Sequence, residues 1–67
     1  MNEFCCIWFE QTQRWIVLFP SGEIIDVEFP AIGYAVNAAL ERIGASESDF
    51  DCEEDTGMFY RYVRELI

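Results

Sequence analysis

Residues 23–44 read EIIDVEFPAIGYAVNAALERIG, and the spacing of their hydrophobic side chains changes along the stretch. From 23 to 29, apolar and acidic residues alternate, which is typical of a half-buried strand. Residues 31–43 instead repeat apolar side chains every three to four positions, which predicts an amphipathic helix. Pro30 suits the first turn of that helix, and Gly44 stands where a left-handed C-terminal cap is favoured. A strand followed closely by a helix predicts an α+β fold.

Two further strands are expected before this stretch, over residues 3–9 and 14–19, because both segments are rich in aromatic and β-branched residues. Both are apolar on their two faces, and a single helix can cover only one face of a small antiparallel sheet. The other face is left for the C-terminal segment, a second copy of the chain or a partner protein. Alternatively, the strands are central and have chain on both sides. Trp8 and Trp15 are core candidates first and binding candidates second.

The C-terminal part allows two interpretations. Residues 49–54 and 58–65 predict a β-hairpin around 55–57, since the second segment is mostly β-favouring. The alternative is a helix, in which Arg61 and Glu65 would form a pair four residues apart. We favour the hairpin, within one small domain that spans residues 1–67.

Composition excludes several classes of function. The chain has 13 acidic and four basic residues, no histidine and a net charge of −9, yet 52% of its residues are hydrophobic and 16% are aromatic. Such a chain can form a core, so disorder is not expected. The absence of histidine and lysine removes imidazole bases and Schiff bases, and we expect no enzyme. Direct nucleic-acid binding is not expected, because phosphates are held by lysine and arginine.

The cysteines do not predict a metal site. Cys5 and Cys6 are neighbours in a strand and would point to opposite faces, and no histidine can complete a zinc site with Cys52. We interpret them as small buried hydrophobes in a reducing cytoplasm. No calcium loop fits the acidic residues, and no cofactor or metal is expected. No targeting signal or stretch of about 20 apolar residues is visible, so no membrane association is expected.

The densest feature is ESDFDCEED, residues 47–55, with six acids in nine residues. In an extended segment, alternate residues share a face at a spacing of about 6.7 Å, and Phe50 and Cys52 would then point inward. Phosphates on one DNA strand rise about 3.4 Å each, and winding increases their true separation. The row could therefore stand in for phosphates, although a solvated loop is the simpler alternative. The acids expected in the row are Glu47, Asp49, Asp51, Glu53 and Asp55.

We expect these acids to bind a basic partner. Asp26 and Glu28 would support them from a different strand. Arg61 and Arg64 would neutralise part of the acidic run, and Tyr60 and Tyr62 would be either contact or packing residues. The full set of expected partner-binding residues is Glu47, Asp49, Asp51, Glu53, Glu54, Asp55, Asp26 and Glu28.

The leading hypothesis is an inhibitor of a basic nucleic-acid-binding protein, in which carboxylates occupy the arginines and lysines that would hold phosphates. In size, acidity and the run at 47–55, the chain resembles the small acidic anti-CRISPR proteins of phages, several of which are DNA mimics. That resemblance rests on no aligned motif. It implies an inhibitor that keeps target DNA from a CRISPR surveillance complex, acting in the cytoplasm of a bacterial host.

Two other classes of function remain open. One is a non-enzymatic interaction module, such as an antitoxin or an assembly subunit, that binds through the apolar sheet face or forms a homodimer. The other is a small carboxylate enzyme, which would need two acids that converge in a pocket.

Overall fold

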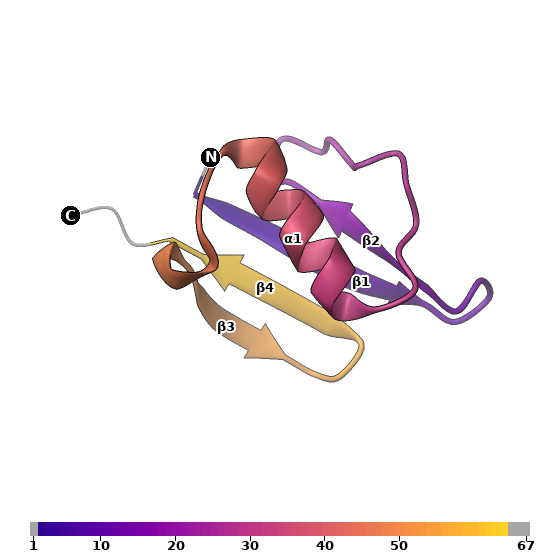
Figure 1. The fold of residues 1–67 in the computed structure, drawn as a ribbon. Coiled ribbons are helices and arrows are strands. Elements are labelled where there is room, and N and C mark those ends of the chain that lie inside the picture. Colours follow the sequence, from indigo (N-terminus) through magenta and orange to yellow (C-terminus); the bar gives the residue numbers. More distant parts are fainter. Residues whose placement is uncertain (1, 65–67) are drawn as a thin grey trace.

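The computed structural model describes residues 2–64, which form one antiparallel sheet with a single α-helix on one side (Figure 1). In sheet order the strands are β2, β1, β4 and β3. The α+β class and the helix on one face agree with the expectation from sequence. The elements are β1 (Glu3–Phe9), β2 (Arg14–Leu18), α1 (Ile32–Ile43), the 3₁₀-helix η1 (Glu47–Asp49), β3 (Asp51–Asp55) and β4 (Phe59–Val63).

The helix forms where its periodicity predicts. Ala35, Val36, Ala39 and Leu40 are its buried residues, and they face the sheet. Gly44 ends the helix with φ 68° and ψ 38°, the left-handed conformation that glycine adopts without steric penalty. Pro30 precedes the helix by two positions and does not occupy its first turn.

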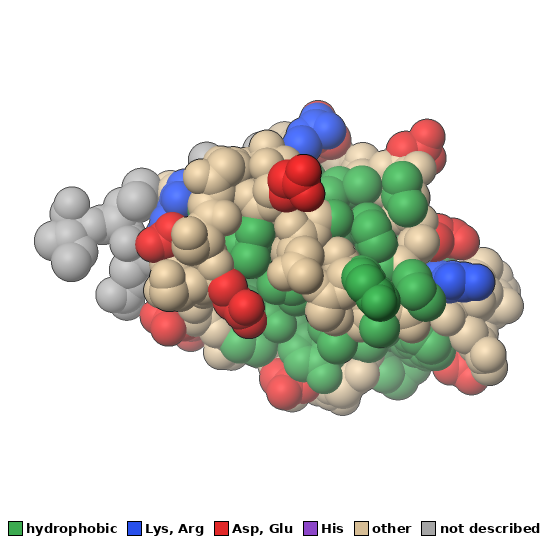
Figure 2. All heavy atoms as spheres, in the orientation of Figure 1, with side chains coloured by type: hydrophobic (Ala, Val, Ile, Leu, Met, Phe, Trp, Pro, Cys, Tyr) green, Lys and Arg blue, Asp and Glu red, His purple; other side chains and the backbone are tan. Residues whose placement is uncertain are grey.

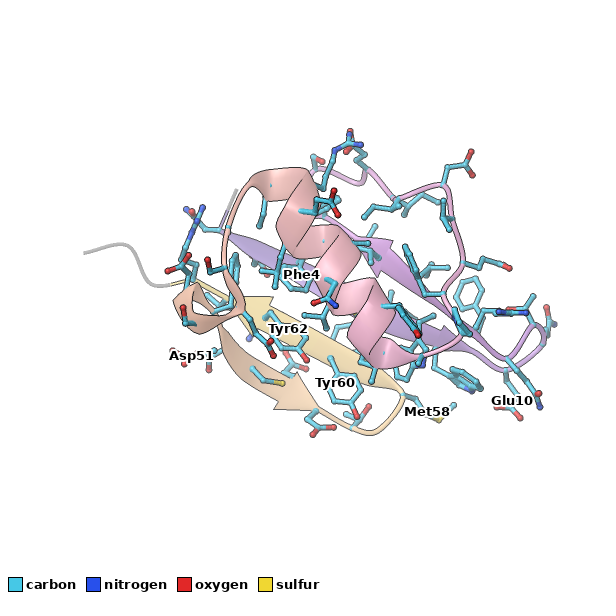
Figure 3. The ribbon with its side chains drawn as sticks, viewed as in Figure 1. Phe4, Glu10, Asp51, Met58, Tyr60 and Tyr62 are labelled. Carbon is cyan, nitrogen blue, oxygen red and sulfur yellow. The ribbon has the colours of Figure 1, made fainter. Side chains whose placement is uncertain are left out.

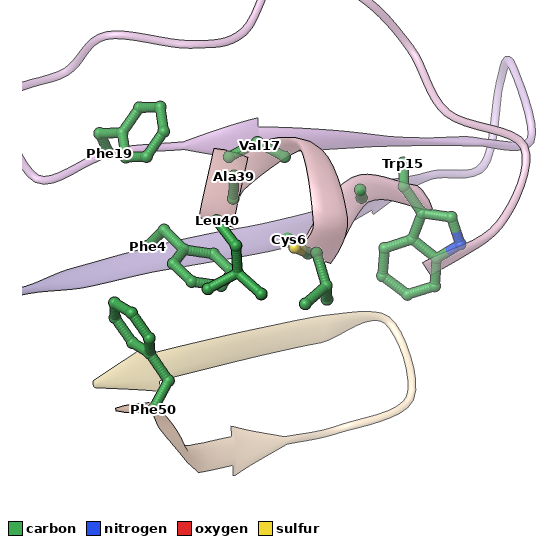
Figure 4. Packing of buried hydrophobic residues seen from close by; sticks show 10 residues of the cluster. Phe4, Cys6, Trp15, Val17, Phe19, Ala39, Leu40 and Phe50 are labelled. Atoms are coloured by element: carbon green, nitrogen blue, oxygen red, sulfur yellow. The ribbon is translucent and has the colours of Figure 1, made fainter. Parts of the chain in front are cut away.

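The core lies between α1 and the β2–β1 half of the sheet (Figure 4). β1 contributes Phe4 and Cys6, and the β2 side contributes Val17 and Phe19, all at most 1% exposed. Alternation along each strand places these side chains on one face, because successive residues point to opposite sides. Trp15 is also buried, as expected of a core tryptophan.

The expected third strand, residues 23–29, is wrong. The segment runs along the free edge of β2 but makes only two isolated bridges, Leu18 with Ile24 and Trp15 with Phe29. Val17 accepts a hydrogen bond from the Ile25 amide at 3.1 Å, so four residues advance from Ile25 to Phe29 while β2 advances by two. The extra residues must leave the ladder, which explains why Val27 is 56% exposed.

The C-terminal hairpin is confirmed over β3 and β4, and the helical alternative is wrong for the described residues. The Thr56 amide donates to the Phe59 carbonyl at 3.1 Å, and Asp55 Oδ1 accepts from the Gly57 amide at 3.0 Å. Gly57 has φ 86°, a conformation that favours glycine. Residue 65, the expected end of the second strand, lies outside the described residues.

The opposite face of the sheet has no covering element among residues 2–64. Its side chains alternate with those of the core, and most of its apolar members are partly exposed. The interpretation in which chain covers both faces therefore does not hold for the described part. The apolar residues of this open face are Cys5, Ile7, Phe9, Ile16, Leu18, Phe59 and Val63.

Candidate partner-binding surface

The acidic run forms one edge of the molecule. Its two elements are η1 and β3, and β3 is the outermost strand of the sheet (Figure 1). Every residue of β3 is exposed. We call the six carboxylates of this run the acidic edge: Glu47, Asp49, Asp51, Glu53, Glu54 and Asp55, all of them exposed.

Local structure holds the first part of the acidic edge in place. A capping box at the start of η1 joins Ser46 and Asp49, with Asp49 Oδ2 accepting from the Ser46 amide at 3.1 Å. The next residue, Phe50, is only 8% exposed, and its ring lies 5.2 Å from that of Phe4. The inward position expected for Phe50 is therefore confirmed, and it anchors η1 to the core.

The expected single row of five acids is wrong. η1 removes Glu47 and Asp49 from the strand, and a bulge between Cys52 and Glu54 shifts the pairing of β3 with β4. Before the bulge, Asp51 is opposite Val63 on the open face. After it, Glu54 is opposite Arg61 on the open face, whereas Asp55 is opposite Tyr60 on the helix side.

The bulge has an electrostatic consequence. It breaks the regular spacing, so that Asp51 and Asp55, which an unbroken strand would place on one side, lie on opposite sides of the sheet. Two charges about 6.7 Å apart repel by roughly 0.6 kcal/mol in water, so a regular row would carry several such penalties. Cys52, which was expected to point inward, is exposed.

Arg61 partly neutralises the acidic edge. Its Nε donates to Glu54 Oε1 at 2.9 Å, and its Nη1 lies 3.7 Å from Glu3 Oε2. The hydrogen bond to Glu54 raises the pKa of the Arg61 guanidinium above its usual value. Among residues 2–64, the Arg61–Glu54 pair is the only salt bridge that involves a carboxylate of the acidic edge.

Asp26 and Glu28 are not brought to the acidic edge. They are exposed in the segment beyond β2, at the other edge of the sheet. At about 4.8 Å per strand, this segment and β3 are separated by roughly 19 Å. Any support they give is to long-range attraction and not to the same contact surface.

A run of aromatic rings lies on the helix side of the sheet. Successive ring centroids are 5.4 Å apart for Trp8 and Trp15, 5.5 Å for Trp15 and Tyr60, and 6.5 Å for Tyr60 and Tyr62. Tyr62 stacks at 4.9 Å on Phe4. The two tyrosines therefore pack against the core, but both stay partly exposed beside the acidic edge (Figure 3).

A groove of about 340 Å³ lies where α1 passes this aromatic run. Burial is the largest cause that raises the pKa of Tyr62 to about 12, and the negative charge of Glu47 adds to it. The position of the groove depends on where α1 crosses the sheet, which no local pattern reports. The residues that line it are Ile32, Gly33, Val36, Asn37, Glu47 and Tyr62.

The three cysteines are free thiols in different environments. Cys6 is buried, Cys5 is partly buried on the opposite face, and Cys52 is exposed. Burial raises the pKa of Cys6 to about 12, so this thiol stays protonated at neutral pH. Within the described range, no group of three or more cysteines and carboxylates could hold a metal ion.

Comparison with protein-family models, with curated proteins and with solved structures found no match to this chain. In the part of the chain that the structure describes, no helix has the length and hydrophobicity needed to cross a membrane.

Proposed function

We propose that this chain is a non-enzymatic inhibitor that binds a basic nucleic-acid-binding protein through its acidic edge. Its carboxylates would occupy arginine and lysine side chains that otherwise hold phosphates, so that the chain and the nucleic acid compete. The net charge of −9 would speed the encounter by long-range attraction.

The observation that carries this proposal is the composition of β3. Four of its five residues are carboxylates, and none of the five is buried. This strand contributes no side chain to the core, so packing does not account for its sequence. Charges on an edge strand also discourage pairing with other strands, and the same carboxylates can serve both purposes.

The bulge in β3 affects how closely the acidic edge can imitate DNA phosphates. The carboxylates do not repeat at one spacing, so the proposal is for an acidic surface and not for a copy of the phosphate register. Such a surface fits a partner whose basic residues are on flexible side chains. Affinity should fall steeply with salt, since exposed charges are screened over about 8–10 Å at physiological ionic strength.

Because the chain resembles DNA-mimic anti-CRISPR proteins, a CRISPR surveillance complex is the first partner to test. The assay measures binding of target DNA by the purified complex with and without this chain. Loss of DNA binding that increases with the concentration of this chain, and that excess target DNA overcomes, supports the proposal. Unchanged DNA binding at low salt argues against this class of partner.

A neutralised variant tests the proposal without assuming a partner. Asp51→Asn, Glu53→Gln and Asp55→Asn together remove three charges from the acidic edge and leave the Arg61–Glu54 pair intact. The matched control removes three exposed charges elsewhere, with Glu10→Gln, Asp26→Asn and Glu41→Gln. Both variants have a net charge of −6, from −9 plus 3.

Immobilised chain would be used to capture proteins from a bacterial lysate, which are then eluted by salt or by double-stranded DNA. The acidic-edge variant should lose the proteins that DNA elutes, while the control variant retains them. Equal retention by both variants would show that the acidic edge has no special part in the binding, and the proposed surface would be wrong.

A second candidate function is favoured by the open sheet face. Cys5, Ile7, Ile16, Leu18 and Phe59 are partly exposed there, which suits a protein interface that is apolar at its centre. An antitoxin or assembly subunit would use this face, as would a homodimer. Ile16→Lys should abolish binding of that kind, whereas the acidic-edge variant should leave it intact.

A further inference from the structure

The groove beside Tyr62 combines three features in one place. An aromatic ring comes from β4, a carboxylate from η1, and an apolar wall from the first turns of α1. Figure 2, which looks onto the helix side, shows hydrophobic side chains exposed below α1 with acidic side chains at their border. Figure 3 shows Tyr60 and Tyr62 on this side of the sheet, next to the helix.

The aromatic floor of the groove is held in place. Tyr62 stacks on the buried ring of Phe4 with an interplanar angle of 17°, so one face of the tyrosine is fixed by the core. Glu47 follows the Ser46 cap of η1, and it lines the same groove as the Tyr62 ring. The ring and the backbone that carries Glu47 are therefore in position before a ligand arrives, which reduces the entropy lost on binding.

The wall of the groove has space for a side chain. Gly33 lines it, and a Cβ added at that position would meet no atom within 4 Å outside the local helix backbone. The volume of about 340 Å³ is small for a ligand pocket, since such pockets span roughly 300–1,000 Å³. This volume suits one long side chain of a partner protein better than a whole element of its structure.

Charge and shape together select the kind of side chain. A guanidinium is planar, can stack on an aromatic ring and can donate two hydrogen bonds to one carboxylate. The chain already has a guanidinium over an aromatic ring elsewhere, where that of Arg64 lies 5.3 Å from the centroid of the Phe50 ring.

We infer that this groove receives an arginine side chain of the basic partner, with the guanidinium between the Tyr62 ring and the Glu47 carboxylate and its aliphatic stem against Ile32 and Val36. The inference rests on the proposed function, because the partner must present a basic segment. It adds a specific anchor to an otherwise diffuse attraction. A lysine of equal charge would bind less well, since its ammonium neither stacks nor pairs in a bidentate way.

The test uses the full chain and two short probe peptides, acetyl-Gly-Arg-Gly-Arg-Gly-amide and its lysine counterpart, at low salt. Backbone amide shifts measured by two-dimensional NMR report where each peptide binds. The arginine peptide should shift residues 33, 37, 47 and 62 most, and it should bind several-fold more tightly than the lysine peptide.

Gly33→Leu is the decisive variant, because it fills the groove wall and leaves every charge unchanged. It should weaken the arginine peptide by about tenfold or more, the loss expected when a charge-assisted contact is blocked. Retained amide dispersion shows that the variant is folded.

Glu47→Gln provides a second route, compared with Glu53→Gln, which removes the same charge from the bulge. Glu47→Gln should weaken binding by about tenfold, and Glu53→Gln by about twofold or less.

The inference would be overturned if the two peptides bound with equal affinity, with shifts spread along β3 and no effect of Gly33→Leu. The acidic edge would then be a diffuse surface without a specific arginine site. Absence of any shift with either peptide would also overturn it. The proposed function is decided separately, by whether captured partners are lost from the acidic-edge variant and eluted by DNA.

Discussion

The two halves of the sheet differ in what they contribute. β2 and β1 lie under α1 and supply the core, together with the helix itself. α1 approaches β4 at the groove beside Tyr62, but among residues 2–64 no buried hydrophobic residue belongs to β4 or β3, and we call these two strands the uncovered half. β4 is partly buried along its length, and β3 is exposed along all of it.

This difference separates stability from recognition. Substitutions in the covered half should change the free energy of unfolding, because they remove buried contacts. Substitutions at the exposed positions of β3 should change the proposed binding and leave the fold intact, whereas Tyr60 and Tyr62 of β4 pack against the core. A chain of 67 residues is expected to have a free energy of unfolding of roughly 3–10 kcal/mol. Because the acidic edge lies apart from the core, its charges take no buried contact away from this small total.

The largest expected effect compares two phenylalanines of β1. Phe4 is fully buried and Phe9 is 45% exposed. Phe4→Ala should lower the free energy of unfolding by about 3–5 kcal/mol, and Phe9→Ala by about 1 kcal/mol or less. Urea denaturation followed by circular dichroism measures both. Phe4→Leu serves as a milder variant if Phe4→Ala does not fold, and equal effects at the two sites would contradict the described core.

The next effect concerns two cysteines, one in each half. The pKa of the buried Cys6 thiol is raised from 9.0 to about 12, so the folded chain holds this proton where the unfolded chain releases it. Stability is therefore complete below about pH 9 and is lost as pH rises toward 12, by up to about 4 kcal/mol.

Urea denaturation between pH 8 and pH 11 would test this effect. Cys6→Ala should flatten the decline in stability with pH. Cys52→Ala, at an exposed position, should leave the decline close to that of the unchanged chain. A decline that is identical in all three proteins would mean that other groups control alkaline unfolding. Tyr62, whose pKa is raised to about 12 mainly by burial, is the next group to consider.

One substitution at two glycines should act in opposite directions. Gly44 has φ 68°, and Gly44→Ala should lower stability by about 1 kcal/mol. Gly33 lies in the first turns of α1 with open space around it, and Gly33→Ala should raise stability by up to about 1 kcal/mol. Melting temperatures compare the two. A loss of stability in Gly33→Ala would show that the groove wall has no spare room.

The smallest expected effect is on the stability of the acidic-edge variant. Removing the charges at Asp51, Glu53 and Asp55 eliminates repulsion but no buried contact, so the free energy of unfolding should change by about 0.5 kcal/mol or less, or rise. A loss of several kcal/mol would show that β3 contributes to the fold in a way that its exposure does not indicate.

Sequence patterns predicted those elements whose cause is local. The helix over 31–43 follows from its apolar stripe and Gly44, and the hairpin follows from β-favouring residues around Gly57. Sequence patterns failed where the pairing between distant segments determines the structure. The alternation over 23–29 resembled a strand, but the bridge between Trp15 and Phe29 forces extra residues out of the ladder.

The candidate site shows the same limit. The run at 47–55 is visible in the sequence, yet the inference of five acids on one face required an unbroken strand. One bulged residue between Cys52 and Glu54, together with the turn of η1, redirects those side chains. The groove at Tyr62 was also inaccessible to pattern analysis, because it arises from helix placement over strands distant in sequence.

The most direct test of the central claim is competition with DNA. A basic protein captured by this chain is bound to a labelled double-stranded oligonucleotide, and the chain is titrated in at low salt. The chain should displace the oligonucleotide, and the control variant with Glu10→Gln, Asp26→Asn and Glu41→Gln should do so almost as well. The variant with Asp51→Asn, Glu53→Gln and Asp55→Asn should fail. Displacement by all three proteins at the same concentration would contradict the claim that the uncovered half binds the partner.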